Sequence, residues 1–162
     1  MSTKQADVLT VDRLTCIPHS SGVRVVDDVS FSIVRGESVG LLGESGVGKT
    51  TLFRAILQLL APNEWQIEGN IAIDGDPVVG LTPKQLEQVR GRKIRTIFQE
   101  PGQSLNPSLK IDRQMIEAVK TISPDLKDTD IWESVVQSLA HAGLPDPHLI
   151  KGRYPGELSG GQ

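Results

Sequence analysis

The segment 41–51 constrains the fold of this chain more than any other, because it contains a complete phosphate-loop pattern. It matches G-x-x-x-x-G-K-[ST], with Gly43, Gly48, Lys49 and Thr50 in the required places. Glycines let the backbone turn tightly and leave N–H groups uncovered, so these groups can point at phosphate oxygens. A helix that follows adds its own unpaired N–H groups and the positive end of its dipole.

The flanks of the loop have the order that such a loop requires. The short apolar run 38–42 predicts a buried strand, and 51–60 has apolar residues at helical spacing and ends before Pro62. Lys49 is expected to reach the β- and γ-phosphates of a nucleotide, and the Thr50 hydroxyl is expected to ligate Mg²⁺. The expected nucleotide-binding residues are Gly43, Glu44, Ser45, Gly46, Val47, Gly48, Lys49, Thr50 and Thr51.

Length and composition exclude several classes of protein. The chain has 162 residues, enough for one core, and a formal net charge of −3, which argues against a nucleic-acid partner held by bulk charge. Its single cysteine, Cys16, cannot form an intrachain disulfide and fits a reducing compartment. No apolar run approaches the ~20 residues that span a bilayer. The polar residues 1–7 are unlike a signal peptide, so a cytosolic protein is expected.

The rest of the chain predicts a strand-rich half followed by a helical half. Strands are expected over 8–16, 23–34, 67–74 and 93–98, and short helices over the segment capped by Thr82 and over 111–121 and 130–142. In the last helix, Asp130 and Glu133 are expected to form a capping-box-like pair, with Ile131, Val135 and Leu139 on one face. We expect the boundary between the two halves after residue 100, which gives a first part over 1–100 and a second part over 101–162.

The last five residues, 158–162, supply a second motif. They read LSGGQ, which is the signature of ATP-binding cassette (ABC) proteins, and the chain resembles the nucleotide-binding subunit of an ABC transporter. Backbone amides and a hydroxyl at such a site suit an anion. The resemblance implies that Ser159, Gly160, Gly161 and Gln162 meet the γ-phosphate of ATP held on the phosphate loop of a second subunit.

Other segments resemble one subgroup of that family. Gln99, at the end of the 93–98 strand, is similar to the glutamine of the family's Q-loop, which implies a Mg²⁺ contact and a role in catalysis beside Lys49. The segments 98–101 (FQEP), 104–107 (SLNP) and 154–157 (YPGE) are similar to the ATPases of oligopeptide, dipeptide and nickel importers.

The resemblance implies an α/β fold: an ABC-type P-loop core with an antiparallel β subdomain and a helical subdomain, its C-terminal part missing from these residues. In the family, the Walker B strand, the catalytic glutamate and the switch histidine follow the signature. The 162 residues are therefore expected to be truncated and, alone, inactive. The family also stacks adenine on an aromatic residue upstream of the loop. Here 17–23 has none, so either His19 stacks or it is an ordinary surface histidine.

The function implied is ATP binding and hydrolysis coupled to import of peptides or of nickel and other metal chelates. The implied partners are a second ABC ATPase subunit, transmembrane permease subunits and, indirectly, a solute-binding protein, with the chain peripheral on the inner face of the plasma membrane. Two alternatives stay open: a non-transport ABC ATPase of the DNA-repair or translation type, and a non-catalytic nucleotide-binding fragment.

A cluster of basic residues lies ahead of Gln99. It consists of Arg90, Arg92, Lys93 and Arg95. A solvated face is favoured over a contact with an acidic partner.

Overall fold

The computed structural model describes residues 6–97, 104–121 and 123–160. It divides into two compact units, Met1–Ile94 and Arg95–Gln162, which are described separately. The boundary expected after residue 100 lies outside the described residues and stays a prediction. Within the described part of the chain, no helix is long and apolar enough to cross a membrane.

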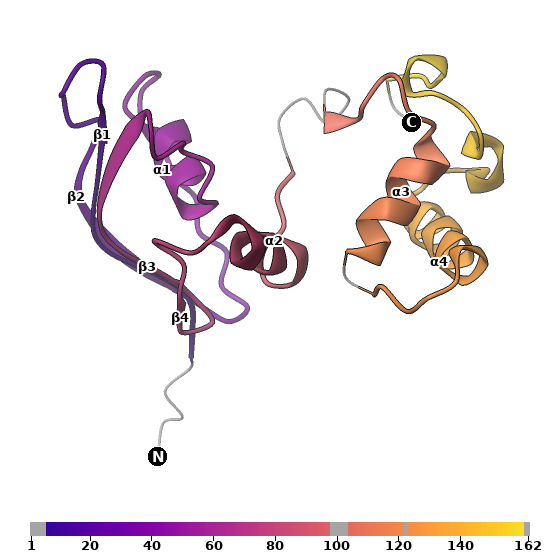
Figure 1. Ribbon diagram of the computed structural model, residues 1–162, viewed down its shortest axis with the longest axis horizontal. Helices are drawn as coiled ribbons and strands as arrows, with labels where there is room; N and C mark the ends of the chain where they lie inside the picture. The colour runs from indigo at the N-terminus through magenta and orange to yellow at the C-terminus, as the bar shows by residue number, and fades with distance from the viewer. Residues whose placement is uncertain (1–5, 98–103, 122, 161–162) are drawn as a thin grey trace. The chain divides into compact units, whose positions relative to one another are not determined.

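The first unit is built on an antiparallel sheet with the strand order β2-β1-β3-β4 (Figure 1). The strands are β1 (Asp7–Pro18), β2 (Val26–Val34), β3 (Trp65–Ile73) and the short β4 (Asp76–Pro77). Every pairing is antiparallel, with Val11 facing Phe31 on one side and Ile71 on the other. The three predicted strands over 8–16, 23–34 and 67–74 are therefore confirmed, with shifts at their ends.

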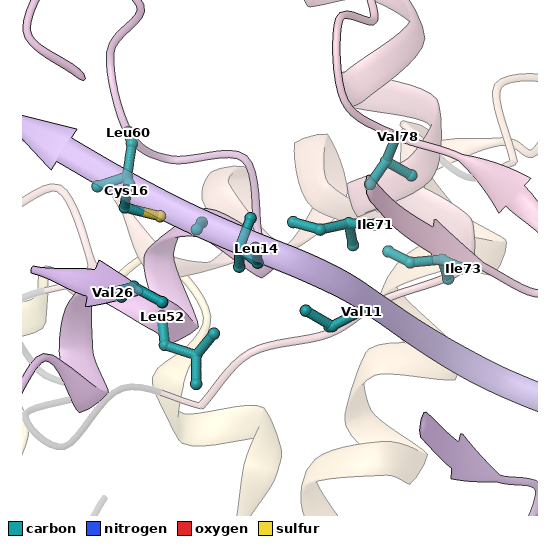
Figure 2. Close-up of a cluster of buried hydrophobic side chains, with 10 residues drawn as sticks. Val11, Leu14, Cys16, Val26, Leu52, Leu60, Ile71, Ile73 and Val78 are labelled. Atoms are coloured by element: carbon teal, nitrogen blue, oxygen red, sulfur yellow. The ribbon is translucent and has the colours of Figure 1, made fainter. Parts of the chain in front are cut away.

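One face of the sheet is covered by helices α1 (Lys49–Ile56) and α2 (Pro83–Arg92) (Figure 1). The core between them is a cluster of buried side chains from the strands, α1 and the connecting loops, shown in Figure 2: Val11, Leu14, Cys16, Val26, Leu52, Ala55, Leu60, Ile71, Ile73 and Val78. Burial of this apolar surface is the main force that holds α1 against the sheet.

Two predicted strands are wrong. Residues 38–42 and 93–97 have no strand pairing, and Leu42 and Ile97 are 93% and 92% exposed. Both segments are apolar runs typical of parallel strands, which are stable only when neighbours pair with them and helices cover both faces. The described residues provide no such neighbour, so the apolar runs do not become strands.

The second unit is helical. Helices α3 (Ile111–Lys120) and α4 (Asp128–His141) pack through a cluster built on Ile111, Ile131, Trp132, Val135, Val136 and Ile150, and the 3₁₀ turns η2 (Pro147–Ile150) and η3 (Pro155–Glu157) follow. The predicted apolar face of α4 is confirmed. The predicted capping pair is wrong, because the N-cap is Lys127 and Asp130 lies inside the first turn. Gly143 ends the region with a φ of 90°, as glycine permits.

Candidate functional site: a phosphate loop and a signature segment

The phosphate loop enters α1 through glycines in conformations that other residues rarely adopt. Gly48 is the N-cap of α1, with a φ of 99°, and Gly46 has a φ of 84°. A Cβ at Gly48 would lie 2.5 Å from the carbonyl oxygen of Val25, which no side chain can tolerate. Gly48 therefore allows the loop to approach the start of β2 closely and turn directly into the helix.

The Lys49 side chain folds back over the loop. Its ammonium donates to the carbonyl oxygens of Gly43 at 2.6 Å and Glu44 at 2.5 Å. This places a positive charge at the centre of the loop, beside the start of α1. The first N–H groups of a helix have no partner within the helix. Together with the Lys49 ammonium, they form a cluster of hydrogen-bond donors at the start of α1.

An open recess of about 270 Å³ lies against this loop. It is lined by Val25, Ser45, Gly46, Gly48, Lys49, Thr50 and Thr51. Six of these seven residues are among those predicted from the sequence. Val25 is the exception: it directly precedes β2, and nothing in the local sequence marks it as a neighbour of the loop. A second recess of about 230 Å³ is mostly apolar and includes Val47 and Leu42.

The residues present suit a polyphosphate. Lysine and backbone amides are donors only, and no carboxylate is among the residues that line the 270 Å³ recess. Thr50 is exposed and follows Lys49 in the chain, so its hydroxyl would be available to coordinate a Mg²⁺ ion held mainly by phosphate and water oxygens. Among the residues that the structure describes, no group of three or more His, Cys, Asp or Glu side chains could hold a metal ion.

His19 does not line either recess next to the loop. Its backbone N–H donates to the Glu64 carbonyl oxygen at 2.8 Å, and its Nε2 lies 3.3 Å from the Pro62 carbonyl oxygen. The exposed imidazole thus lies between the end of β1 and the loop before β3, which favours the alternative that His19 is an ordinary surface histidine.

The signature segment is anchored to the second unit from its N-terminal side. The Gly152 N–H donates to Asp112 Oδ1 at 3.2 Å, and the Ile111 N–H donates to the Arg153 carbonyl at 2.9 Å. Leu158 packs against the helical core, whereas Ser159 and Gly160 are exposed. The fold therefore presents the first part of the signature at the surface. Three predicted site residues, Gln99, Gly161 and Gln162, lie outside the described residues.

The basic cluster is not a uniform solvated face. Arg90 donates from Nε to the Leu57 carbonyl at 3.1 Å and from Nη2 to the Gln58 carbonyl, and Lys93 pairs with Asp76. The predicted solvated face is wrong for Arg90, which is half-buried, whereas Lys93 is an exposed residue that pairs with a carboxylate at the surface. Both partners are far away in the sequence, so spacing alone could not reveal them.

Comparison with known proteins agrees with both motifs. The family described as "ABC transporter" matches residues 26–162. The oligopeptide transport ATP-binding protein OppD of Lactococcus lactis subsp. cremoris (strain SK11) is 38% identical over 141 residues, which are 85% of this chain and 40% of that protein. The metal-staphylopine import system ATP-binding protein CntD of Staphylococcus aureus (strain NCTC 8325 / PS 47) is 32% identical over 154 residues, 95% of this chain and 56% of that protein.

Solved structures give the same result for the fold. The dimeric post-hydrolysis state of the ATP-binding cassette MJ0796, bound to ADP and Pi, matches with a TM-score of 0.77 and 25% identity, over 95% of this chain and 64% of that one. The structure of cbiO1 from Clostridium perfringens matches with a TM-score of 0.69 and 26% identity, over 96% and 57%. The chain spans about half the length of the curated relatives that it matches. The chain belongs to the ABC transporter family.

Proposed function

We propose that this chain is the ATP-binding part of an ABC importer ATPase, which couples ATP hydrolysis to transport of peptides or metal chelates. The observation that carries the proposal is the loop–helix element of the first unit, where Lys49 and the amides at the start of α1 converge on one recess. The substrate class rests on the named relatives, which are an oligopeptide transport protein and a metal-staphylopine import protein.

The phosphate chain of ATP is held by charge and by fixed donors. Lys49 leaves at least one of its two carbonyl partners and donates to the β- and γ-phosphate oxygens. Gly46 and Gly48, with their positive φ angles, shape the loop that lines the recess, and backbone N–H groups of this loop are the proposed donors to the phosphate oxygens. Mg²⁺, when bound, would neutralise charge on the phosphates, and Thr50 and Gln99 are the proposed ligands.

The signature segment is proposed to contact a different ATP molecule from the one bound by the phosphate loop of the same chain. Ser159, Gly160, Gly161 and Gln162 are proposed to contact ATP bound to a second ABC ATPase subunit. Exposure of Ser159 and Gly160 supports this, since a contact across an interface needs both at the surface. The further proposed partners are transmembrane permease subunits and, indirectly, a solute-binding protein, which would put the chain on the cytoplasmic face of the plasma membrane.

Turnover needs a group that orients the attacking water, in addition to phosphate binding. In the family, the catalytic glutamate follows the signature. We therefore expect the 162 residues alone to bind ATP without hydrolysing it, and hydrolysis to belong to a polypeptide that supplies that glutamate.

Lys49→Ala tests the proposal, because it removes the ammonium that lies over the loop. ATP affinity of the folded protein should fall at least about tenfold, the usual scale for a lost charge-assisted contact. Lys84→Ala is the matched control, since Lys84 is an exposed lysine of α2 in the same unit. Equal ATP affinity in Lys49→Ala and Lys84→Ala, with both proteins folded by circular dichroism, would rule out the proposed site.

A further inference from the structure

The helix that carries the phosphate loop is held at its opposite end by a side chain from α2. Arg90 Nε donates to the Leu57 carbonyl at 3.1 Å, and Nη2 donates to the Gln58 carbonyl. The last carbonyl groups of a helix have no partner inside the helix and carry the negative end of its dipole. Arg90 satisfies two carbonyls directly after α1 and places a positive charge there.

This end of α1 can adopt few other arrangements. Gln58 has a φ of 54°, in the left-handed region that non-glycine residues occupy at a cost, and its side-chain amide donates to the Ala55 carbonyl at 2.8 Å. Ala55 and Leu57 are 0% and 5% exposed. The turn is therefore fixed by packing, by a side-chain amide and by the guanidinium together.

The guanidinium itself is held on a well-anchored helix. Thr82 accepts from the Gln85 N–H while the Gln85 side chain accepts from the Thr82 N–H, and Pro83 occupies the first turn. Just after α2, Lys93 pairs with Asp76 of β4. Arg90 is therefore a part-buried charge held on an element that is fixed at both ends.

We infer that Arg90 is a positioning residue for the phosphate site, an inference that rests on the function proposed above. Helix α1 has only eight residues and is ~12 Å long, so a tilt of ~5° about its far end moves its N-terminus by ~1 Å. A misplacement of this size is enough to spoil a site built from directed donors. By holding Leu57 and Gln58, Arg90 fixes the direction in which the amides at the start of α1 and Lys49 face the nucleotide.

The two arginines in the last turn of α2 provide a matched pair of variants. Arg90→Ala and Arg92→Ala remove the same charge from the same turn, and Arg92 is exposed. Arg90→Lys keeps the charge but loses the two-pronged geometry. Ile73→Val, a mild change in the buried sheet core, serves as a destabilised variant in which Arg90 and its two carbonyl partners are unchanged.

ATP affinity is measured by calorimetry at a temperature where every variant is folded. We expect Arg90→Ala to bind ATP about tenfold more weakly than Arg92→Ala and Ile73→Val, with Arg90→Lys between them. Equal ATP affinity in Arg90→Ala and Arg92→Ala would overturn the inference. An Arg90→Ala affinity equal to that of Ile73→Val would also overturn it, because it would show general destabilisation only.

Hydrogen exchange without nucleotide separates this inference from the proposed function. In the ligand-free protein, amides of α1 and of Leu57–Gln58 should exchange at least about tenfold faster in Arg90→Ala than in Arg92→Ala. If wild type fails to bind ATP yet α1 loses protection in this way, the proposed function fails while Arg90 still holds the helix. Unchanged protection of α1 would refute the role of Arg90.

Discussion

Gly48 is the residue at which the phosphate loop depends most strictly on backbone geometry. Its φ of 99° is unfavourable for other residues, and the position of its missing Cβ is 2.5 Å from the Val25 carbonyl oxygen. Gly46 has a similar φ of 84°, but a Cβ there would meet nothing within 4 Å. An alanine at Gly46 would therefore cause backbone strain alone, whereas an alanine at Gly48 would cause both strain and a steric clash.

Gly46→Ala should lower the free energy of unfolding by about 1–2 kcal/mol, the cost of a left-handed non-glycine residue. Gly48→Ala should lower it clearly more, because the methyl group must also displace the start of β2. Urea unfolding of both variants measures the difference. Equal losses would mean that the close approach between Gly48 and Val25 does not exist in solution.

The buried thiol of Cys16 should make the stability of the sheet core depend on pH. Its thiol is completely buried, and burial raises its pKa from an ordinary 9.0 to about 11. Between these pH values an unfolded thiol has lost its proton and the folded one has kept it, so the unfolded state binds fewer protons. The free energy of unfolding should therefore fall as the pH rises from 9 to 11.

Comparison with Cys16→Ala isolates this effect from the titration of lysine and tyrosine. The variant should lose less stability than wild type across the same pH window. The native thiol should also react slowly with a thiol reagent at pH 8 and rapidly after unfolding. Fast labelling of the folded protein would contradict the buried position of Cys16 in β1.

At the residue scale, the motif specifies each position of the loop chemically, so the sequence alone suffices to name its candidate site residues. Six of the seven residues around the 270 Å³ recess belong to the predicted set, and Val25 does not, because it comes from outside the motif and only the fold brings it next to the loop. Arg90 was misread for a related reason. Its partners are carbonyl groups, which any residue possesses, so no residue type marked them.

At the element scale, the sequence predicted the elements whose apolar faces are covered within this chain. The strands β1, β2 and β3 pair with one another, and their buried side chains pack with those of α1. In the other unit, α4 buries Ile131 and Val135 against α3. The apolar runs 38–42 and 93–97 have strand-like sequences but no pairing partner among the described residues. Of the three apolar residues Phe53, Ile56 and Leu57 at the end of α1, only Phe53 is exposed, and Leu57 is buried.

The segment 38–42 should therefore bind an apolar dye in the 162-residue chain. Val39, Leu41 and Leu42 are 54%, 53% and 93% exposed, and Leu41 and Leu42 line the apolar recess beside the loop. Leu42→Ser should reduce the fluorescence of bound anilinonaphthalene sulfonate more than Leu149→Ser, which changes an exposed leucine of the other unit. A chain that binds no dye, and melts cooperatively above about 50 °C, would contradict this exposure.

At the scale of the whole molecule, the phosphate loop and the signature belong to different units of the chain. The proposed function has them acting on different nucleotides, which requires a second subunit. Ser159→Arg should leave ATP affinity within about twofold of wild type while abolishing ATP-driven dimerisation, because a bulky charged side chain blocks only the shared interface. Ser134→Arg, an exposed change on α4, should leave both intact.

Sedimentation velocity with and without ATP measures the dimer, and calorimetry measures affinity. A Ser159→Arg protein that loses ATP affinity and dimerisation together would show that Ser159 supports the fold of its own subunit. Such a result is physically possible, because the residues just before Ser159 are anchored to the helical unit: Gly152, Arg153 and Leu158.

Nuclear magnetic resonance can map where Mg·ATP contacts the protein. In ¹⁵N-labelled protein, titration with Mg·ATP should move the amide resonances of residues 43–51 most, with saturation, and Lys49→Ala should remove these shifts. Pyrophosphate should move the same amides, because the loop is proposed to recognise the phosphate chain. If Mg·ATP moves no amide of this loop, or moves another surface while residues 43–51 stay unchanged, the phosphate loop is not the nucleotide site.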